Sequence, residues 1–206
     1  MRKIKDKKEL VKLCSYIIMG DGGVYKSSKE NINFRFSMNM IEINQDYIEL
    51  CKDILENITS CSITQRVKEG SRISQLNLQS KVHPFFTTLR DRIYTDNYKG
   101  IDPHALKLLD YEALSFLYMS DGCLSLKHNA IRPSITLNMC RLSYGDMFIL
   151  KKALKEKLDL EWNINKNGKY YYLVLRVKDH EKFINSISSY ITPSFNYKIL
   201  YTAPFK

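Results

Sequence analysis

Two aspartates at matching places in the chain are the first candidates for chemistry. Asp21 and Asp121 each follow an apolar run that ends in methionine and one small residue, and each precedes a glycine. A carboxylate at the C-terminal end of a helix is disfavoured by about 0.3–1 kcal/mol, because the helix dipole is negative there. If two such helices pack together, the carboxylates converge, and both stay ionised only when a cation lies between them. The residue types therefore predict a hard divalent cation, Mg²⁺ or Mn²⁺, bound by Asp21 and Asp121.

The chain repeats itself with an offset of 99 or 100 residues. The recurring segments are SYIIMGDG from residue 15 and SFLYMSDG from residue 115, FSMNM from residue 36 and ITLNM from residue 135, and Asn97-Tyr98-Lys99 and Asn196-Tyr197-Lys198. A single Asp-Gly pair is most often a helix stop followed by a turn, but two pairs in duplicated contexts favour a functional site. The repeat predicts an N-terminal half, 1–100, and a C-terminal half, 101–206, joined near Gly100 and Pro103.

Each half follows the pattern helix, two strands, helix, two strands, helix. Apolar residues at helical spacing predict a first helix over 7–21 and over 104–121, each ending at a glycine that can adopt a left-handed cap. Further helices are predicted near 46–58, 82–94, 146–158 and 180–190.

Alternating apolar and polar residues predict strands at 32–40 and 134–139. The apolar face of the first strand, which we expect to pack on helices, carries Ile32, Phe34, Phe36, Met38 and Met40. Glu69-Gly70 and Asn167-Gly168 lie between strand-like segments and predict hairpin turns.

The opposite strand faces carry amides, hydroxyls and guanidinium groups with almost no acidic residues, whereas an ordinary wet sheet face carries Thr, Lys and Glu. Amides and guanidinium groups can pair with adenine and guanine edges in the DNA major groove, which a two-stranded ribbon can enter. Asn39 and Asn138 lie near strand ends, where they could instead orient an active-site water or bond the strand end. The candidate DNA-binding residues are Asn33, Arg35, Ser37, Asn39, Thr64, Arg66, Lys68, Gln75, Asn77 and Gln79 in the first half, and Arg132, Ser134, Thr136, Asn138, Asn165, Tyr170, Tyr172 and Arg176 in the second.

The composition is typical of a folded protein with a polyanionic partner. Of 206 residues, 32 are Lys or Arg and 22 are Asp or Glu, which gives a formal net charge of +10, and 44% are hydrophobic. These values exclude a disordered chain, and they favour nucleic acid as the partner if the basic residues share a face. Five cysteines without a CxxC pair indicate neither a disulfide framework nor a zinc knuckle. The apolar stretch nearest the N-terminus, LCSYIIMG, is too short to span a bilayer, so we expect no membrane partner and a reducing intracellular compartment. We also expect a monomer, since one chain carries both copies of the repeat.

The segments LCSYIIMGDG and ALSFLYMSDG resemble the LAGLIDADG motif, and two copies so spaced resemble the single-chain, two-motif LAGLIDADG homing endonucleases. The resemblance covers the chain from about residue 7 to residue 200. It implies an α+β fold of two pseudo-twofold-related αββαββα halves, with the motif helices packed at the interface and two saddle-shaped antiparallel sheets over a long DNA site. The chain departs from the namesake letters at Tyr16 and Phe116, where the motif has Gly, and at Met19 and Met119, where it has Asp.

The same resemblance implies roles for residues at the motif positions. Asp21 and Asp121 match the metal-binding acids, and Gly20 and Ser120 match small residues that allow close helix packing and whose carbonyls are further candidate metal ligands. Lys99 and Lys198 lie where similar proteins have a basic residue facing the scissile phosphate, although most lysines are simply solvated. A lysine at that place would stabilise charge on the phosphate or help to activate water.

These features together predict a site-specific endonuclease that hydrolyses both strands of a long duplex DNA site with a divalent metal. The alternative is a binder that no longer cuts, such as an RNA maturase that binds intron RNA and assists splicing. A third interpretation is a basic structural protein in which the repeat serves stability alone, and which binds DNA weakly and without sequence preference.

Overall fold

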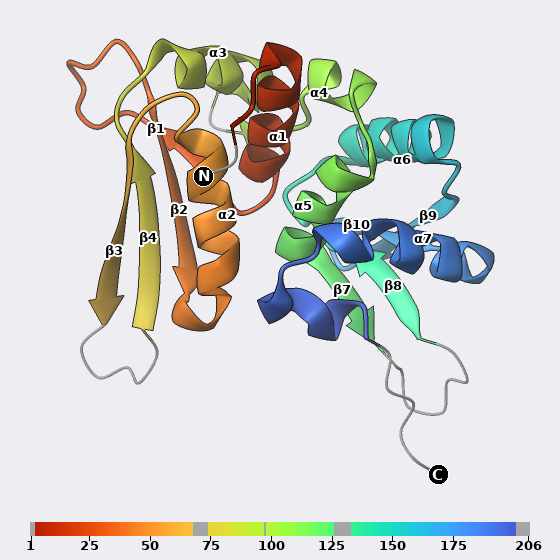
Figure 1. Cartoon of the computed structure of the whole chain (residues 1–206). Helices are drawn as coiled ribbons and strands as arrows, with labels where there is room; N and C mark the ends of the chain where they lie inside the picture. Colours follow the sequence, from red (N-terminus) through yellow and green to blue (C-terminus); the bar gives the residue numbers. More distant parts are fainter. Residues whose placement is uncertain (1–2, 68–73, 97, 126–132, 201–206) are drawn as a thin grey trace. The chain divides into compact units, whose positions relative to one another are not determined.

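Each half of the chain builds one four-stranded antiparallel sheet with helices packed on it (Figure 1). The computed structural model describes residues 3–67, 74–96, 98–125 and 133–200. The chain divides into two compact units, Met1–Ala105 and Leu106–Lys206. The predicted combination of helices with antiparallel sheets is therefore confirmed.

The N-terminal unit has a sheet with the strand order β1-β2-β4-β3. Its elements are α1 (Lys7–Met19), β1 (Gly23–Tyr25), β2 (Arg35–Ile41), the 3-10 helix η1 (Glu42–Asn44), α2 (Gln45–Leu55), β3 (Cys61–Val67), β4 (Ser74–Ser80), α3 (Pro84–Ile93), the short pair β5 (Tyr94–Thr95) and β6 (Tyr98–Lys99), and α4 (Pro103–Lys107). The helices α2 and α3 pack on the strands, and α1 packs on both of these helices.

The C-terminal unit repeats this architecture with the strand order β7-β8-β10-β9. Its elements are α5 (Tyr111–Asp121), β7 (Gly122–Ser125), β8 (Ser134–Leu137), α6 (Tyr144–Leu158), β9 (Trp162–Asn167), β10 (Tyr170–Leu175), the 3-10 helix η2 (Val177–Asp179), α7 (His180–Ile187), and the 3-10 helices η3 (Ser188–Tyr190) and η4 (Pro193–Lys198). The aromatic side chains of Tyr118, Trp162 and Phe183 pack edge to face in its core.

Strand alternation assigns one face of each sheet to the core and leaves the other face open. In β2, Phe36, Met38 and Met40 are buried, as predicted, while Ser37 and Asn39 point the other way. A helix covers only the apolar face, because burying apolar surface there is favourable at about 25 cal/mol per Å². The open face is thus available to a ligand as large as a nucleic acid.

The predicted strand over 32–40 begins too early. The structure starts β2 at Arg35, and Ile32 is 85% exposed instead of packing on a helix. The cause is a competing hydrogen bond, since the Thr87 hydroxyl of α3 donates to the Asn33 side chain and accepts from the Phe34 backbone N–H. This pair of bonds draws the segment toward α3 and out of the sheet ladder. The second predicted strand, 134–139, ends at Leu137.

The predicted helix over 104–121 is two helices. The Asp110 side chain accepts from the Ala113 N–H at 2.8 Å and begins α5 at Tyr111, so α4 ends before it. The predicted helix over 7–21 ends at Met19. Among the described residues, no helix is both long and apolar enough to cross a membrane.

The predicted left-handed glycine caps are wrong, because these glycines are required for space and not for a positive φ. A Cβ on Gly22 would lie 2.5 Å from Phe36 Cε2 and 2.8 Å from the Ile17 carbonyl oxygen. A Cβ on Gly122, whose φ is −79°, would overlap both the ring and the carbonyl of Tyr118. The one glycine with positive φ in the described chain is Gly168, in the predicted β9–β10 hairpin turn, which is confirmed. Glu69-Gly70 lies outside the described residues.

Candidate functional site

The two candidate catalytic aspartates lie where each first helix meets the first strand of its sheet. Asp21 is exposed and occupies the turn between α1 and β1. Asp121 is half-buried and is the last residue of α5, and its carbonyl oxygen accepts from the Asn138 N–H at 2.8 Å. Each carboxylate is therefore delivered to the edge of a sheet whose other face is open.

The Lys99 ammonium lies at the C-terminal end of α1. Its Nζ donates to the carbonyl oxygens of Ile18, Gly20 and Gly22, at 2.9, 2.5 and 3.0 Å, and the residue is only 9% exposed. Helix-terminal carbonyls lack intrahelical partners and carry partial negative charge, so a cation there is favourable. The positive charge that the aspartate-ended helix requires is thus supplied in part by this lysine.

The Lys198 ammonium lies at the C-terminal end of α5, as Lys99 does at the end of α1. Its Nζ donates to the carbonyl oxygens of Met119, at 2.6 Å, and Tyr118, at 3.4 Å, and the residue is 7% exposed. The Tyr118 hydroxyl donates back to the Lys198 carbonyl at 2.8 Å, and burial raises the pKa of Tyr118, which keeps that hydroxyl protonated. A direct contact of either lysine with phosphate stays a prediction.

The available oxygen ligands suit a hard cation that keeps several of its bound water molecules. No group of three or more His, Cys, Asp and Glu side chains gathers as a metal site within the described ranges, and each unit brings one carboxylate. Mg²⁺ commonly binds through one or two carboxylates, with water and phosphate as the other ligands, so the chemistry of each unit's single aspartate suits this ion. The Gly20 carbonyl, another predicted ligand, already accepts from Lys99, and the half-buried Ser120 lies beside Asp121.

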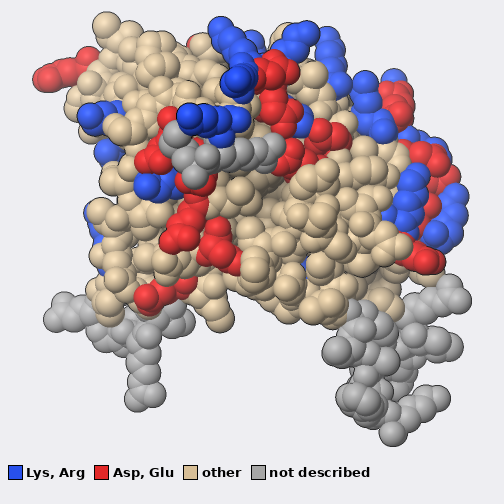
Figure 2. Space-filling view, in the orientation of Figure 1, with Lys and Arg blue, Asp and Glu red and all other residues tan. Residues whose placement is uncertain are grey.

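The strands of both four-stranded sheets contain no Asp or Glu. In the N-terminal unit, one group of acidic side chains lies along α2, the helix that packs on β2, β3 and β4, and acidic atoms gather over this part of the surface in Figure 2. The group comprises Asp46, Glu49, Asp53 and the C-cap residue Glu56. Because the acidic residues are kept off the open face, a polyanion meets no like charge from the strands there.

On the open face of the N-terminal sheet, seven of the predicted polar residues lie in cross-strand rows, together with Ser62 and Ile41, which were not predicted. The rows, in the order β2, β4, β3, are Ser37, Gln79, Ser62; Asn39, Asn77, Thr64; and Ile41, Gln75, Arg66. Asn77 is only 6% exposed and donates to the Asn39 side-chain oxygen at 2.6 Å. Asn77 therefore orients Asn39, and it is Asn39 that is exposed to a ligand. Asn33 lies outside this face, and Lys68 lies outside the described residues.

One end of this face is hollowed into an open depression of about 610 Å³. Arg35, Ser62, Gln79 and Lys81 contribute to its lining, and the Arg35 Nε is buried there without a hydrogen-bond partner in the described part of the chain. Sequence reasoning missed Lys81, which follows β4, and Tyr25, which is exposed opposite Arg35. Continuing the strand alternation through β1 would have found Tyr25.

On the open face of the C-terminal sheet, tyrosines lie opposite asparagines. Tyr170 pairs with Asn167 and Tyr172 with Asn165, while Thr136 of β8 accepts from the Asn138 side chain at 3.0 Å. The Ser134 side chain also belongs to this face by alternation along β8. Arg132 lies outside the described residues. Hydroxyl and amide groups thus dominate this face, beside the aromatic rings of the two tyrosines.

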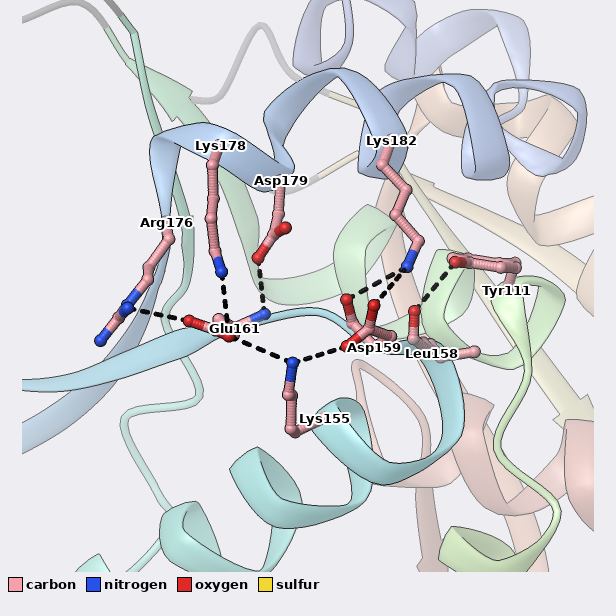
Figure 3. A network of polar contacts seen from close by, with 9 residues as sticks. All are labelled: Tyr111, Lys155, Leu158, Asp159, Glu161, Arg176, Lys178, Asp179 and Lys182. Atoms are coloured by element: carbon pink, nitrogen blue, oxygen red, sulfur yellow. Dashed lines mark hydrogen bonds and ion pairs between the residues drawn. The ribbon is translucent and has the colours of Figure 1, made fainter.

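Arg176 follows β10, and its guanidinium is engaged by an acidic residue. It contacts Glu161 at 2.8 Å, and Lys178 and Lys155 contact the same carboxylate at 2.9 and 3.1 Å (Figure 3). The hydrogen bonds from Lys178 and then Lys155 lower the pKa of Glu161 to about 2. This network joins α6, the residue just before β9 and the start of η2, so Arg176 has a structural partner besides any contact with DNA.

The stability of the C-terminal unit should therefore depend on the Glu161 carboxylate at pH values above the range in which this group titrates. A carboxyl whose pKa is lowered by folding stabilises the fold above its unfolded pKa and stops doing so as the pH falls toward the folded pKa. We expect Glu161→Gln to lower the melting temperature at pH 7, and we expect the difference from wild type to vanish between about pH 4.5 and pH 2. Thermal unfolding across that range measures this. Glu156→Gln, which removes a more exposed i,i+4 pair with Lys152, is the control and should change little.

Comparison with known proteins identifies relatives of this fold. Residues 17–183 match the family model described as the LAGLIDADG DNA endonuclease family. The chain is 25% identical over 196 residues to Protein RecA of Mycolicibacterium flavescens, a match that covers 89% of this chain and 44% of that protein. The chain thus spans less than half the length of this curated relative.

Two solved structures share the fold. The homing endonuclease I-WcaI bound to its DNA recognition sequence superposes with a TM-score of 0.78 and 24% identity, covering 96% of this chain and 88% of that one. I-DmoI in complex with DNA and Mn superposes with a TM-score of 0.56 and 17% identity, covering 89% of this chain and 98% of that one.

Proposed function

The chain belongs to the LAGLIDADG DNA endonuclease family, and from this membership and its own surface we propose that it is a site-specific double-strand DNA endonuclease. The observation that carries the proposal is the pairing, in each unit, of an acid-free open sheet face with one aspartate at the edge of that sheet. The first feature suits a phosphate-rich duplex, and the second suits hydrolysis of its backbone. The DNA in the I-WcaI and I-DmoI structures supports the same assignment.

In this proposal, one set of residues binds the DNA and another set takes part in hydrolysis. The open-face amides and Arg66 contact base edges, and the lysines near the strand ends, such as Lys81, contact phosphates. Asp21 and Asp121 hold the divalent cation, Mg²⁺ or Mn²⁺, which when bound supplies Lewis-acid stabilisation of the phosphate and of the leaving oxygen. One chain carries both units, so we propose that a monomer suffices for both strand cuts.

Arg66 offers the sharpest test of the binding surface. It is exposed at the end of β3 and lies opposite Gln75 on the open face. We expect Arg66→Glu to weaken duplex binding by about tenfold or more, because a base or phosphate contact of this kind is worth about 1–3 kcal/mol. The measurement is fluorescence anisotropy with the duplex enriched from a randomised DNA library, at several salt concentrations.

The matched control for Arg66→Glu is Lys52→Glu on α2. It makes the same change of charge on the covered side of the sheet, beside Glu56. Both variants lower the net charge equally, so a general electrostatic effect would weaken binding equally in both. Equal weakening, or failure to enrich any duplex, would contradict the proposal, and stronger binding of structured intron RNA than of the enriched duplex would favour a maturase.

A further inference from the structure

The two predicted catalytic lysines share one position although they come from different kinds of element. Lys99 belongs to β6 of the short β5–β6 pair, whereas Lys198 ends the 3-10 helix η4. Both nonetheless bring a buried ammonium to the last carbonyls of the helix that carries the unit's candidate aspartate. A position that is kept while its local backbone differs indicates that the placement of the ammonium matters.

In the N-terminal unit, the contacts of Lys99 bracket Asp21. The carbonyl oxygens of Gly20 and Gly22, directly before and after Asp21, both accept from the same Nζ. One ammonium with three donors thus bonds the backbone on both sides of the carboxylate-bearing residue. In the C-terminal unit, Lys198 bonds the Met119 and Tyr118 carbonyls, in the final helical turn before Asp121.

The electrostatic balance at each helix end favours the same interpretation. The carboxylate and the helix-terminal carbonyls are both negative, and they would repel each other without a nearby cation. The lysine neutralises this repulsion from the protein side.

We infer that Lys99 and Lys198 are positioning residues, which hold the helix ends of Asp21 and Asp121 in place through backbone carbonyls instead of contacting the scissile phosphate. The inference rests on the proposed function, since the groups that are positioned are its metal-binding carboxylates. Each lysine acts on its own unit.

The first arm of the test needs neither metal nor DNA. Amide hydrogen exchange of the full chain, followed by NMR, reports the order of each turn, because the Gly22 N–H donates to Ile17 and the Gly122 N–H to Tyr118. In Lys99→Met, we expect exchange at Gly22 to accelerate by about tenfold or more while Gly122 is unchanged. In Lys198→Met, we expect the reverse. Lys107→Met, which removes an exposed lysine at the end of α4, should change neither amide.

The second arm measures single-turnover cleavage. Lys99→Met should lower the rate constant by about a hundredfold, as small misplacements do, with duplex affinity within about threefold of wild type. Lys99→Arg should restore most of the rate without altering the pH–rate profile, because a guanidinium also donates to carbonyls and never loses its proton. If Lys99→Met does not fold, Lys99→Gln is measured in both arms.

Each outcome decides between the possibilities. Unchanged exchange at Gly22 together with lost cleavage would overturn the inference and assign Lys99 to the phosphate. A pH–rate profile that shifts in Lys99→Arg would overturn it in favour of proton transfer by the lysine. Accelerated exchange at the matching glycine, in a protein that cuts no enriched duplex, would support the positioning role and refute the proposed endonuclease.

Discussion

The double variant Asp21→Asn, Asp121→Asn should bind its duplex almost as tightly as the wild type and cut neither strand. The substitution keeps the size of the side chain and one of its two oxygens but removes the two charges that a divalent cation requires. The open sheet faces, which are the proposed DNA-binding surfaces, are not altered by these substitutions. We expect cleavage to fall by roughly a thousandfold or more, since losing the metal removes several kcal/mol of charge stabilisation.

Cleavage of a supercoiled plasmid that contains the enriched duplex site, with Mg²⁺ or Mn²⁺ added, measures this effect. The control is Asp91→Asn with Glu181→Gln, which removes one exposed acidic charge from α3 and one from α7. That control should cut at the wild-type rate. A double Asp21, Asp121 variant that still linearises the plasmid would refute the assignment of these carboxylates.

The single variants carry additional information about the metal. If the two carboxylates share an ion, either single replacement should stop both cuts. If each carboxylate serves its own ion, a single replacement should leave a nicked circle. The ratio of nicked to linear product separates these two outcomes.

Gly122→Ala should destabilise the C-terminal unit more than any other small substitution discussed above. An added Cβ would overlap the ring and the backbone carbonyl of Tyr118. That ring is held by an edge-to-face contact with Phe183, with centroids 4.9 Å apart, and by its hydrogen bond to Lys198. The ring and the carbonyl of Tyr118 cannot move away without losing their own contacts. We therefore expect the free energy of unfolding to fall by about 3 kcal/mol, at the upper end of the range for overpacked cores.

The melting temperature is the measurement, and Gly145→Ala is the matched control. At Gly145, near the start of α6, the nearest atom to an added Cβ is Ser143 Oγ at 3.7 Å, an ordinary contact. Because alanine favours helix more than glycine does, this variant should melt at or slightly above the wild-type temperature. Equal melting temperatures for Gly122→Ala and wild type would show that the turn after α5 yields more easily than its packing indicates.

The patterns that depend on neighbouring residues were readable from the sequence. The alternation of β2 and the Asn167-Gly168 turn are local, because strand faces and two-residue turns depend on residues close in sequence. The 99–100 residue repeat was readable for another reason, since it appears when the sequence is compared with itself. The exclusion of Ile32 from β2 could not be predicted from the sequence. It depends on the hydrogen bonds of Asn33 and Phe34 to Thr87 in α3. The break between α4 and α5 had a local signal in the Asp110 cap, but the apolar spacing outweighed it.

The sequence by itself determined which residues could do chemistry, since two duplicated aspartates, two duplicated lysines and acid-free strands are properties of residue type and order. Only the tertiary structure decided what the lysines touch. Lys99 reaches carbonyls that lie 77 to 81 residues away in sequence, and Lys198 reaches others 79 and 80 residues away. Such contacts arise when distant segments pack against one helix end, and the spacing of residue types along the chain carries no record of that packing.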